Sequence, residues 1–139
     1  MRTLFFTVIM AISVLMPAGY SDAQTDTAVN TKIQLETAQK VTFRSKGMNV
    51  SALLYTPDDY QQGEKRPAIV FIRPASGVKE QTAGLYAKLM SDRGFVTLAY
   101  DPRGFGDSEG VVRQRENPFA VAEDARNAIS YLVTLPQVD

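Results

Sequence analysis

The sequence predicts an α/β protein with a mixed sheet, in which an antiparallel hairpin is followed by parallel strands with covering helices. Two observations carry this prediction. Strand-like and helix-like segments follow one another in the order hairpin, strand, helix, strand, helix. The two later strand segments, 67–72 and 95–100, are nearly continuous apolar runs, which is typical of strands buried on both faces of a parallel sheet.

The hairpin is predicted by two short β-like runs around a turn. Residues 40–45 alternate apolar with polar side chains, residues 46–48 supply the turn, and residues 50–55 return as a second strand. The segment 56–66 is rich in turn-forming residues and leads into the first buried strand.

A first helix is predicted over residues 80–93. Gly94 follows it, at a position where a left-handed residue commonly ends a helix. Apolar side chains recur at helical spacing at Ala83, Tyr86, Ala87 and Met90.

A second helix is predicted from Asn117 and Pro118, an N-cap residue followed by proline at the first helical position. We expect its buried face to carry Ala122, Ala125, Ile129 and Leu132.

Composition limits the chemistry. The 139 residues are 45% hydrophobic, with 15 basic and 15 acidic side chains, so nothing suggests a nucleic-acid partner. There is no cysteine, which excludes disulfides and thiolate sites. There is also no histidine, the most common general base and metal ligand near neutral pH. We therefore expect no metal and no cofactor.

The first segment has the pattern of an export signal. Arg2 precedes an apolar run over residues 4–16, and small residues lead to a cleavage site after Ala23. A retained membrane anchor and a buried helix are the alternatives, but the run is shorter than the about 20 residues that a spanning helix needs. The sequence predicts a signal peptide over 1–23, a flexible lead-in over 24–38 and a domain over 39–139, located in the periplasm or secreted, without a stable membrane span after signal removal.

Residues 101–108 read D-P-R-G-F-G-D-S directly after a predicted buried strand. This loop resembles the D-x-R-G-x-G-x-S loop of many α/β-hydrolases. Its glycines permit backbone angles that other residues avoid, and its arginine can hold a turn by binding carboxylates or carbonyls. We expect a structural loop beside the site, formed by Asp101, Arg103, Gly104, Gly106 and Ser108.

Residues 106–110 also match G-x-S-x-G, the pattern of a serine nucleophile elbow. An elbow needs a sharp strand-to-helix turn, whereas here the predicted strand ends near Tyr100 and the next helix begins near Asn117. No histidine could activate Ser108. We interpret Ser108 as structural and name no catalytic residue in this chain.

The loop 73–81 resembles the H-P-G-G-x-K-E-Q loop of dienelactone-hydrolase-like proteins, with Arg73 where histidine is usual. Its Arg-Pro start is similar to the loop of X-Pro dipeptidyl-peptidase-like hydrolases, a neighbouring branch of the same fold. The resemblance implies that the backbone amide of Ala75 or Ser76 faces a substrate carbonyl oxygen. An ordinary strand-to-helix connection is the alternative.

In the family, a linker like residues 135–139 precedes the fifth strand, the nucleophile, the acid and the histidine. The resemblance implies the N-terminal, incomplete portion of an α/β-hydrolase sheet, with residues 69–72 as an exposed apolar edge. We expect a fragment of an exported serine hydrolase for ester, lactone or acyl-peptide bonds, inactive alone, whose partner is a small ester or peptide-like substrate once completed. The alternatives are a short exported non-catalytic binding module and one half of a split hydrolase completed by a second chain.

Overall fold

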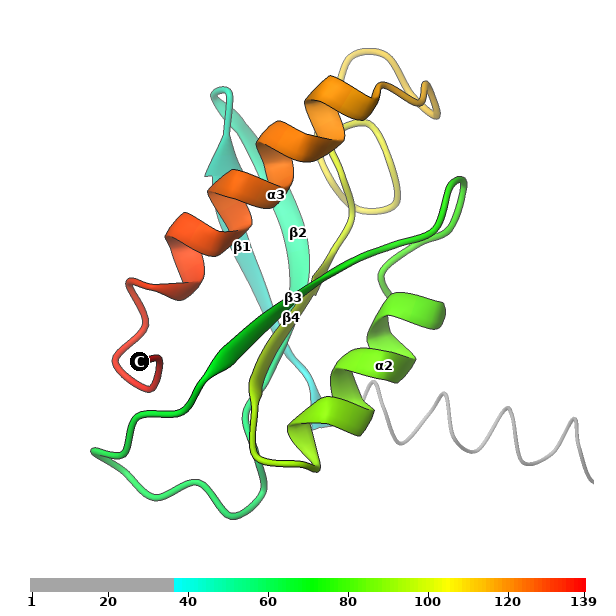
Figure 1. The fold of residues 1–139 in the computed structure, drawn as a ribbon. Coiled ribbons are helices and arrows are strands. Elements are labelled where there is room, and N and C mark those ends of the chain that lie inside the picture. Colours follow the sequence, from blue (N-terminus) through cyan, green and yellow to red (C-terminus); the bar gives the residue numbers. More distant parts are fainter. Residues whose placement is uncertain (1–36) are drawn as a thin grey trace, which may run out of the picture.

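A computed structural model describes residues 37–139 (Figure 1). The predicted signal peptide and nearly all of the lead-in lie outside the described residues, so their boundaries stay predictions. No helix within the described range is long and apolar enough to cross a membrane. The elements are β1 (Gln39–Ser45), β2 (Met48–Tyr55), β3 (Ala68–Ile72), α2 (Thr82–Ser91), β4 (Val96–Tyr100) and α3 (Pro118–Leu132).

The four strands form one mixed sheet in the order β1-β2-β4-β3. β1 pairs with β2 and β2 with β4 in antiparallel fashion, whereas β3 and β4 are parallel. The connection from β3 to β4 runs through α2, as a parallel crossover requires. The predicted α/β class, with an antiparallel hairpin followed by parallel strands, is confirmed.

The helices cover opposite faces of the sheet, which gives three layers (Figure 1). Successive residues of a strand point to opposite faces, so β4 divides its side chains between two cores. Leu98 and Tyr100 pack with α3, together with Ala128 and Leu132. Ala99 packs on the other side with the small residues of α2. Both layers thus depend on one fully buried central strand.

The hairpin turn consists of Lys46 and Gly47, which both have positive φ, 48° and 78°. Two residues of this kind make the turn that matches the right-handed twist of paired strands. The predicted hairpin is present, with Met48 already in the second strand.

The predicted stripe of α2 is only partly correct. Ala83 and Ala87 are buried, whereas Tyr86 is 54% exposed. The helix packs closely on the sheet through small residues, and a Cβ on Gly84 would lie 3.3 Å from the Tyr55 hydroxyl oxygen of β2. A bulky ring does not fit such a close contact, so Tyr86 lies outside it. The predicted left-handed stop is present, since Gly94 has φ 93°.

The start signal of α3 is confirmed, but its predicted buried face is only partly correct, since Leu132 is buried and Ala125 packs against the core. The Asn117 side chain accepts hydrogen bonds from the amides of Phe119 and Ala120 at 3.1 and 3.3 Å, and Pro118 begins the helix. Ala122 and Ile129 are exposed. The face turned to the sheet carries Asp124, Ala128 and Leu132. A buried carboxylate sets the rotation of this helix, which a purely apolar pattern does not reveal.

β3 is not buried on both faces, because it lies at the edge of the sheet with β4 as its neighbour. Its first four residues are partly buried and Ile72 is 50% exposed. This is the exposed apolar edge that the family resemblance implies. At its start, Arg66 forms a single parallel bridge with Val138, whose side chain is buried.

Removing the cap of α3 tests the helix assignment. We expect Asn117→Ala to lower the free energy of unfolding by about 1 kcal/mol, because two backbone amides lose their acceptor. Asn117→Asp keeps an acceptor and should stay close to the parent chain. Urea unfolding followed by circular dichroism measures both, and equal stability of the alanine variant would contradict the capping role.

Candidate functional site

The candidate site lies where the carboxyl ends of β3 and β4 meet. These strands are parallel, so the loops that follow them leave the sheet at the same edge, a common place for ligands in α/β folds. The loop after β3 spans 73–81 and the loop after β4 spans 101–117. The contacts between the two loops include those of Lys79 with Asp101 and of Ser76 with Glu116.

The two oxyanion-loop candidates are both exposed at this edge. Ser76 has φ 62°, and its amide donates a hydrogen bond of 3.0 Å to Oε1 of Glu116. Ala75 lines a neighbouring hollow together with Ile72. Both residues are small and lie at the surface, but the Ser76 amide is bonded to Glu116, and their predicted role in binding a substrate carbonyl stays a prediction.

Ser108 lies inside the loop and not on a strand-to-helix turn. Its side chain is 1% exposed. The hydroxyl oxygen accepts from the Ser51 amide at 2.8 Å and donates to the Asp101 carbonyl oxygen at 2.6 Å. These bonds join the loop to β2 and leave the hydroxyl turned away from solvent, a position that differs from that of an exposed nucleophile.

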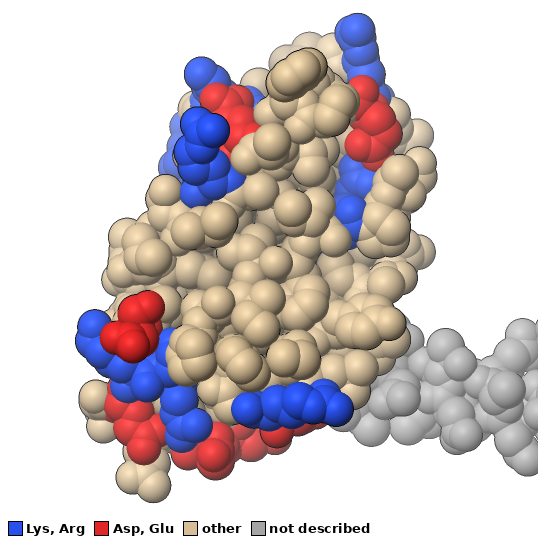
Figure 2. Space-filling view, viewed as in Figure 1, with Lys and Arg blue, Asp and Glu red and all other residues tan. Residues whose placement is uncertain are grey.

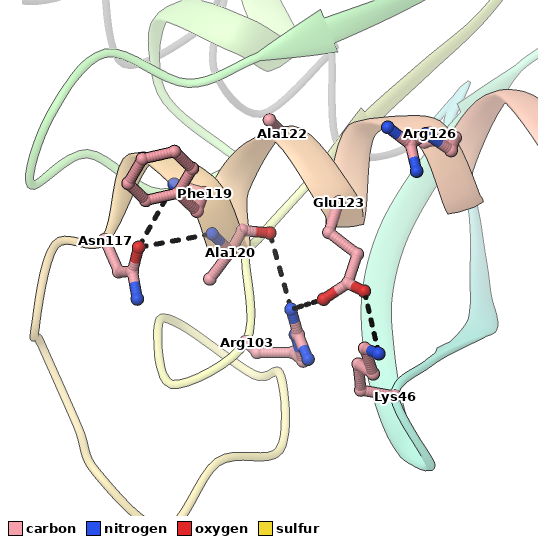
Figure 3. A pocket seen from close by; sticks show the side chains of 8 residues that line it. All are labelled: Lys46, Arg103, Asn117, Phe119, Ala120, Ala122, Glu123 and Arg126. Atoms are coloured by element: carbon pink, nitrogen blue, oxygen red, sulfur yellow. Dashed lines mark hydrogen bonds and ion pairs between the residues drawn. The ribbon is translucent and has the colours of Figure 1, made fainter.

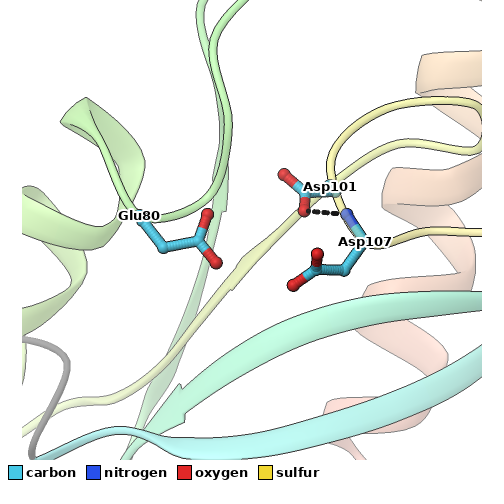
Figure 4. A group of neighbouring side chains, drawn as sticks. All are labelled: Glu80, Asp101 and Asp107. Carbon is cyan, nitrogen blue, oxygen red and sulfur yellow. Dashed lines mark hydrogen bonds between the residues drawn. The ribbon is translucent and has the colours of Figure 1, made fainter.

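The carboxylate of Asp101 is the centre of the loop contacts. Asp101 is fully buried and accepts from the backbone amides of Lys79 and Asp107, at 2.8 and 3.1 Å, and from Nζ of Lys79 at 2.8 Å. Figure 4 shows Asp101 beside Asp107 and Glu80. Three donors on one carboxylate satisfy most of its hydrogen-bonding capacity, so its burial is compensated.

Lys79 explains why three carboxylates can approach one another. Oxygen atoms of Glu80, Asp101 and Asp107 lie within 4.8 Å of one another, a spacing that could hold a metal ion. Nζ of Lys79 lies 2.7 to 2.9 Å from an oxygen of each. Because the Lys79 side chain is 1% exposed and lies among the three carboxylates, its ammonium group supplies the positive charge that balances them. The acidic cluster therefore binds Lys79 in this structure.

Lys79 and Asp107 stabilise each other's charged forms. Burial alone would lower the pKa of Lys79, but the hydrogen bonds to Asp101, Glu80 and Asp107 outweigh it and raise the pKa above its usual range. The same contact lowers the pKa of Asp107. Lys79 is therefore a poor general base, because it keeps its proton at any ordinary pH.

The predicted loop residue Arg103 anchors the other side of the same loop. Its Nε lies 2.6 Å from Oδ1 of Asp124, and its second amino group lies 2.8 Å from Glu123, which also pairs with Lys46 (Figure 3). Asp124 is fully buried, and besides this ion pair it accepts hydrogen bonds from the Arg103 amide and from the Ser45 hydroxyl. Arg103 thus connects the loop to α3.

A hollow of about 640 Å³ adjoins this arginine and is seen in Figure 3. The hydrogen bonds and ion pairs of Arg103, Glu123 and Lys46 run along its wall. These contacts lower the pKa of Glu123, chiefly through the hydrogen bond from Arg103. The charges of Arg103, Glu123 and Lys46 are paired with one another, so these three residues fit a structural role better than a reactive one.

Both predicted loop glycines are required by close contacts. Gly104 has φ 82°, and a Cβ there would lie 2.4 Å from the Val112 carbonyl oxygen. Gly106 has φ 45°, and a Cβ there would lie 2.0 Å from Oδ2 of Asp101. Gly106 therefore allows the loop to close directly over the buried carboxylate.

The structure brings together Asp101, Arg103, Gly104, Gly106 and Ser108 in one loop, and Ala75 and Ser76 in the facing loop. Sequence reasoning assigned no role to Lys79, Glu116 or Asp124. Lys79 could have been found from its place in the K-E-Q part of the family-like loop. Asp124 and Glu116 carry no local sequence signal, because their partners lie at least 21 residues away in the chain.

Removing the buried lysine tests the central contact. We expect Lys79→Met to lower the free energy of unfolding by about 3 kcal/mol, because Asp101 would remain buried without its counter-charge. Lys46→Met is the control, since that lysine is 64% exposed and its ion pair should contribute less than about 1 kcal/mol. Equal losses in urea unfolding would contradict the central role of Lys79.

A methyl group tests the closure of the loop. We expect Gly106→Ala to cost more than about 3 kcal/mol, because it adds a collision with Asp101 to an unfavourable backbone angle. Gly63→Ala has a positive φ but open space around it, so it should cost about 1 kcal/mol. Thermal unfolding compares the two, and a Gly106 variant as stable as the Gly63 variant would argue against the contact.

Comparison with known proteins identifies the family to which this chain belongs. Residues 46–138 match the family described as X-Pro dipeptidyl-peptidase (S15 family). The chain is 45% identical over 103 residues to protein YcjY of Escherichia coli K12, a match that covers 72% of this chain and 34% of YcjY.

Two solved structures have the same arrangement of elements. The crystal structure of PA2218 from Pseudomonas aeruginosa is 43% identical, with a TM-score of 0.69, and the match covers 73% of this chain and 32% of that protein. The α/β-hydrolase GrgF from Penicillium is 24% identical, with a TM-score of 0.66 over 73% of this chain and 34% of GrgF, and shares the fold. The chain spans about a third of the length of these relatives. It belongs to the X-Pro dipeptidyl-peptidase (S15) family and forms an N-terminal part of the α/β-hydrolase fold.

Proposed function

We propose that this chain is the part of an exported serine hydrolase that shapes the active site, and that it is inactive without the remaining part of the fold. The intact enzyme would cleave ester, lactone or acyl-peptide bonds in a small substrate. The match of residues 46–138 to a hydrolase family is the observation that carries this proposal.

The geometry of the described residues is consistent with a chain that shapes the active site but does not supply the reacting groups. The loop after β3 exposes the small residues Ala75 and Ser76, whose backbone amides could bind an acyl carbonyl oxygen, the Ser76 amide once Glu116 releases it. Ser108 is engaged in two hydrogen bonds to backbone groups. Without histidine, the chain has no side chain of the usual kind to activate a serine. The nucleophile, the acid and the base would therefore come from elsewhere.

The open edge of β3 supports completion by a further strand. Ile72 is 50% exposed at that edge, and the partner that a strand normally has on its second side is absent from the described residues. The strand could come from a longer product of the same gene or from a second polypeptide, as in a split hydrolase. A non-catalytic exported module would use the same edge to bind another protein.

Translation of the DNA beyond the codon for Asp139, in all frames, tests the proposal. We expect an apolar strand, then G-x-S-x-G or G-x-C-x-G, and later a histidine. If none of these follows and no separate reading frame supplies them, the hydrolase proposal fails and the binding module replaces it.

Chemical labelling tests the same proposal on the proteins. We expect a fluorophosphonate probe to leave the 139-residue chain unlabelled, and Ser108→Ala to behave identically. The chain joined to the downstream segment should be labelled at the elbow serine and should hydrolyse p-nitrophenyl acetate at least about 1,000-fold faster than the chain alone. Labelling of Ser108 in the short chain would contradict its structural role.

A further inference from the structure

Arg73 is a buried cation whose donors are incompletely used. It follows β3 directly, and its side chain is 2% exposed. The guanidinium carbon lies 3.9 Å from the centroid of the Phe105 ring, and one amino group donates to the Pro74 carbonyl oxygen at 2.8 Å. Nε and the second amino group form no well-aligned hydrogen bond within residues 37–139. Such a planar fork is suited to binding two oxygens at once.

The charge partner of Arg73 among the described residues is Glu116. Its Oε1 lies 2.9 Å from the second amino group of Arg73 and also accepts the Ser76 amide at 3.0 Å. Both contacts use the same carboxylate oxygen, so the pairing with the guanidinium is not bidentate. The Ser76 amide and Arg73 lower the pKa of Glu116, which is therefore charged at neutral pH.

Glu116 is easily displaced compared with the arginine it contacts. Its side chain is 41% exposed, and it lies in the loop before α3. A partly exposed carboxylate is already hydrated in part, and water readily solvates it when it leaves its partner. Its ion pair therefore contributes little free energy. The buried arginine, in contrast, requires a negative partner, because an isolated buried charge is costly. Any other carboxylate that reaches Arg73 could take the place of Glu116.

A hollow leads to this pair. It has a volume of about 410 Å³, with Arg73 and Glu116 in its lining and mostly apolar side chains around them. Ile72 and Val121 form part of these walls, and Ala75 of the oxyanion loop lies on the same hollow. Apolar walls lower the local dielectric constant and strengthen a charge contact at the polar end. The hollow thus combines an apolar surface with a partly free guanidinium.

We propose that this hollow binds a substrate that carries its own carboxylate, which replaces Glu116 on Arg73 and so frees the Ser76 amide for the acyl carbonyl oxygen. This inference rests on the proposed hydrolase function and narrows its substrates to small acyl compounds with an apolar body and one acidic end. Glu116 then acts as an internal placeholder that keeps the arginine paired while the site is empty. The ligand gains the two-point contact that Glu116 does not make.

Binding to the 139-residue chain tests the inference without any turnover. Benzoate serves as the carboxylate probe and benzamide as its neutral counterpart, titrated at constant ionic strength while the Ser76 amide is followed by NMR. We expect benzoate to shift that amide and benzamide to leave it unchanged. Glu116→Gln removes the internal competitor and should strengthen benzoate binding by about tenfold or more, because a larger fraction of the site is free.

Matched variants separate this outcome from a purely structural ion pair. Glu109→Gln removes an exposed carboxylate that hydrogen bonds to Asn49, so its benzoate affinity should equal that of the parent. Arg73→Gln should abolish benzoate binding, and Glu116→Gln remains informative if that variant does not fold. No benzoate binding by Glu116→Gln, or equal binding of benzamide, would overturn the inference. Either result leaves the hydrolase proposal standing, since the downstream sequence tests that separately.

Discussion

The ion pair between Lys79 and Asp101 holds the two site loops together. Both side chains are buried, and removal of two charges from water costs more than their attraction returns unless other donors complete the arrangement. Here the backbone amides of Lys79 and Asp107 supply those donors. Lys79 follows Ala75 and Ser76 in the first loop, and Asp101 begins the second loop. The position of Ala75 and Ser76 relative to the second loop therefore depends on the contact between Lys79 and Asp101.

A second buried carboxylate repeats this solution on the opposite side of the sheet. Asp124 in α3 forms an ion pair with the Arg103 guanidinium and accepts hydrogen bonds from the Arg103 backbone amide and the Ser45 hydroxyl. The long loop after β4 is thus held by Asp101 within its own start and by Asp124 from the helix that follows. A loop of this length without regular structure would otherwise be mobile. Two internal carboxylates instead fix the loop to the sheet and to α3, whereas Glu116 near its end remains exposed.

Local sequence patterns were sufficient to predict the strands, helices and turns, but not the long-range contacts of their side chains. The hairpin, the glycine stop of α2 and the Asn117 cap depend on neighbouring residues, and each was predictable from them. The family-like loops were likewise readable as motifs. Burial of Asp124 and the pairing of Glu116 with Arg73 depend on partners far along the chain, so no local periodicity encodes them. Sequence reasoning therefore located the loops without finding the charges that organise them.

The wrongly predicted burial has one physical explanation. β3 and the residues Ala122 and Ile129 of α3 read as buried, yet they are partly or largely exposed. Ala122 and Ile72 line one hollow, and Ile129 follows Ala122 by two helical turns on the same side of α3. In Figure 2 the face that carries β3 is uncharged in its middle, with charged side chains toward its rim. Exposed apolar side chains that lie close together on an uncharged face mark a contact region, so the apolar pattern of these residues reflects binding at this face and not burial within residues 37–139.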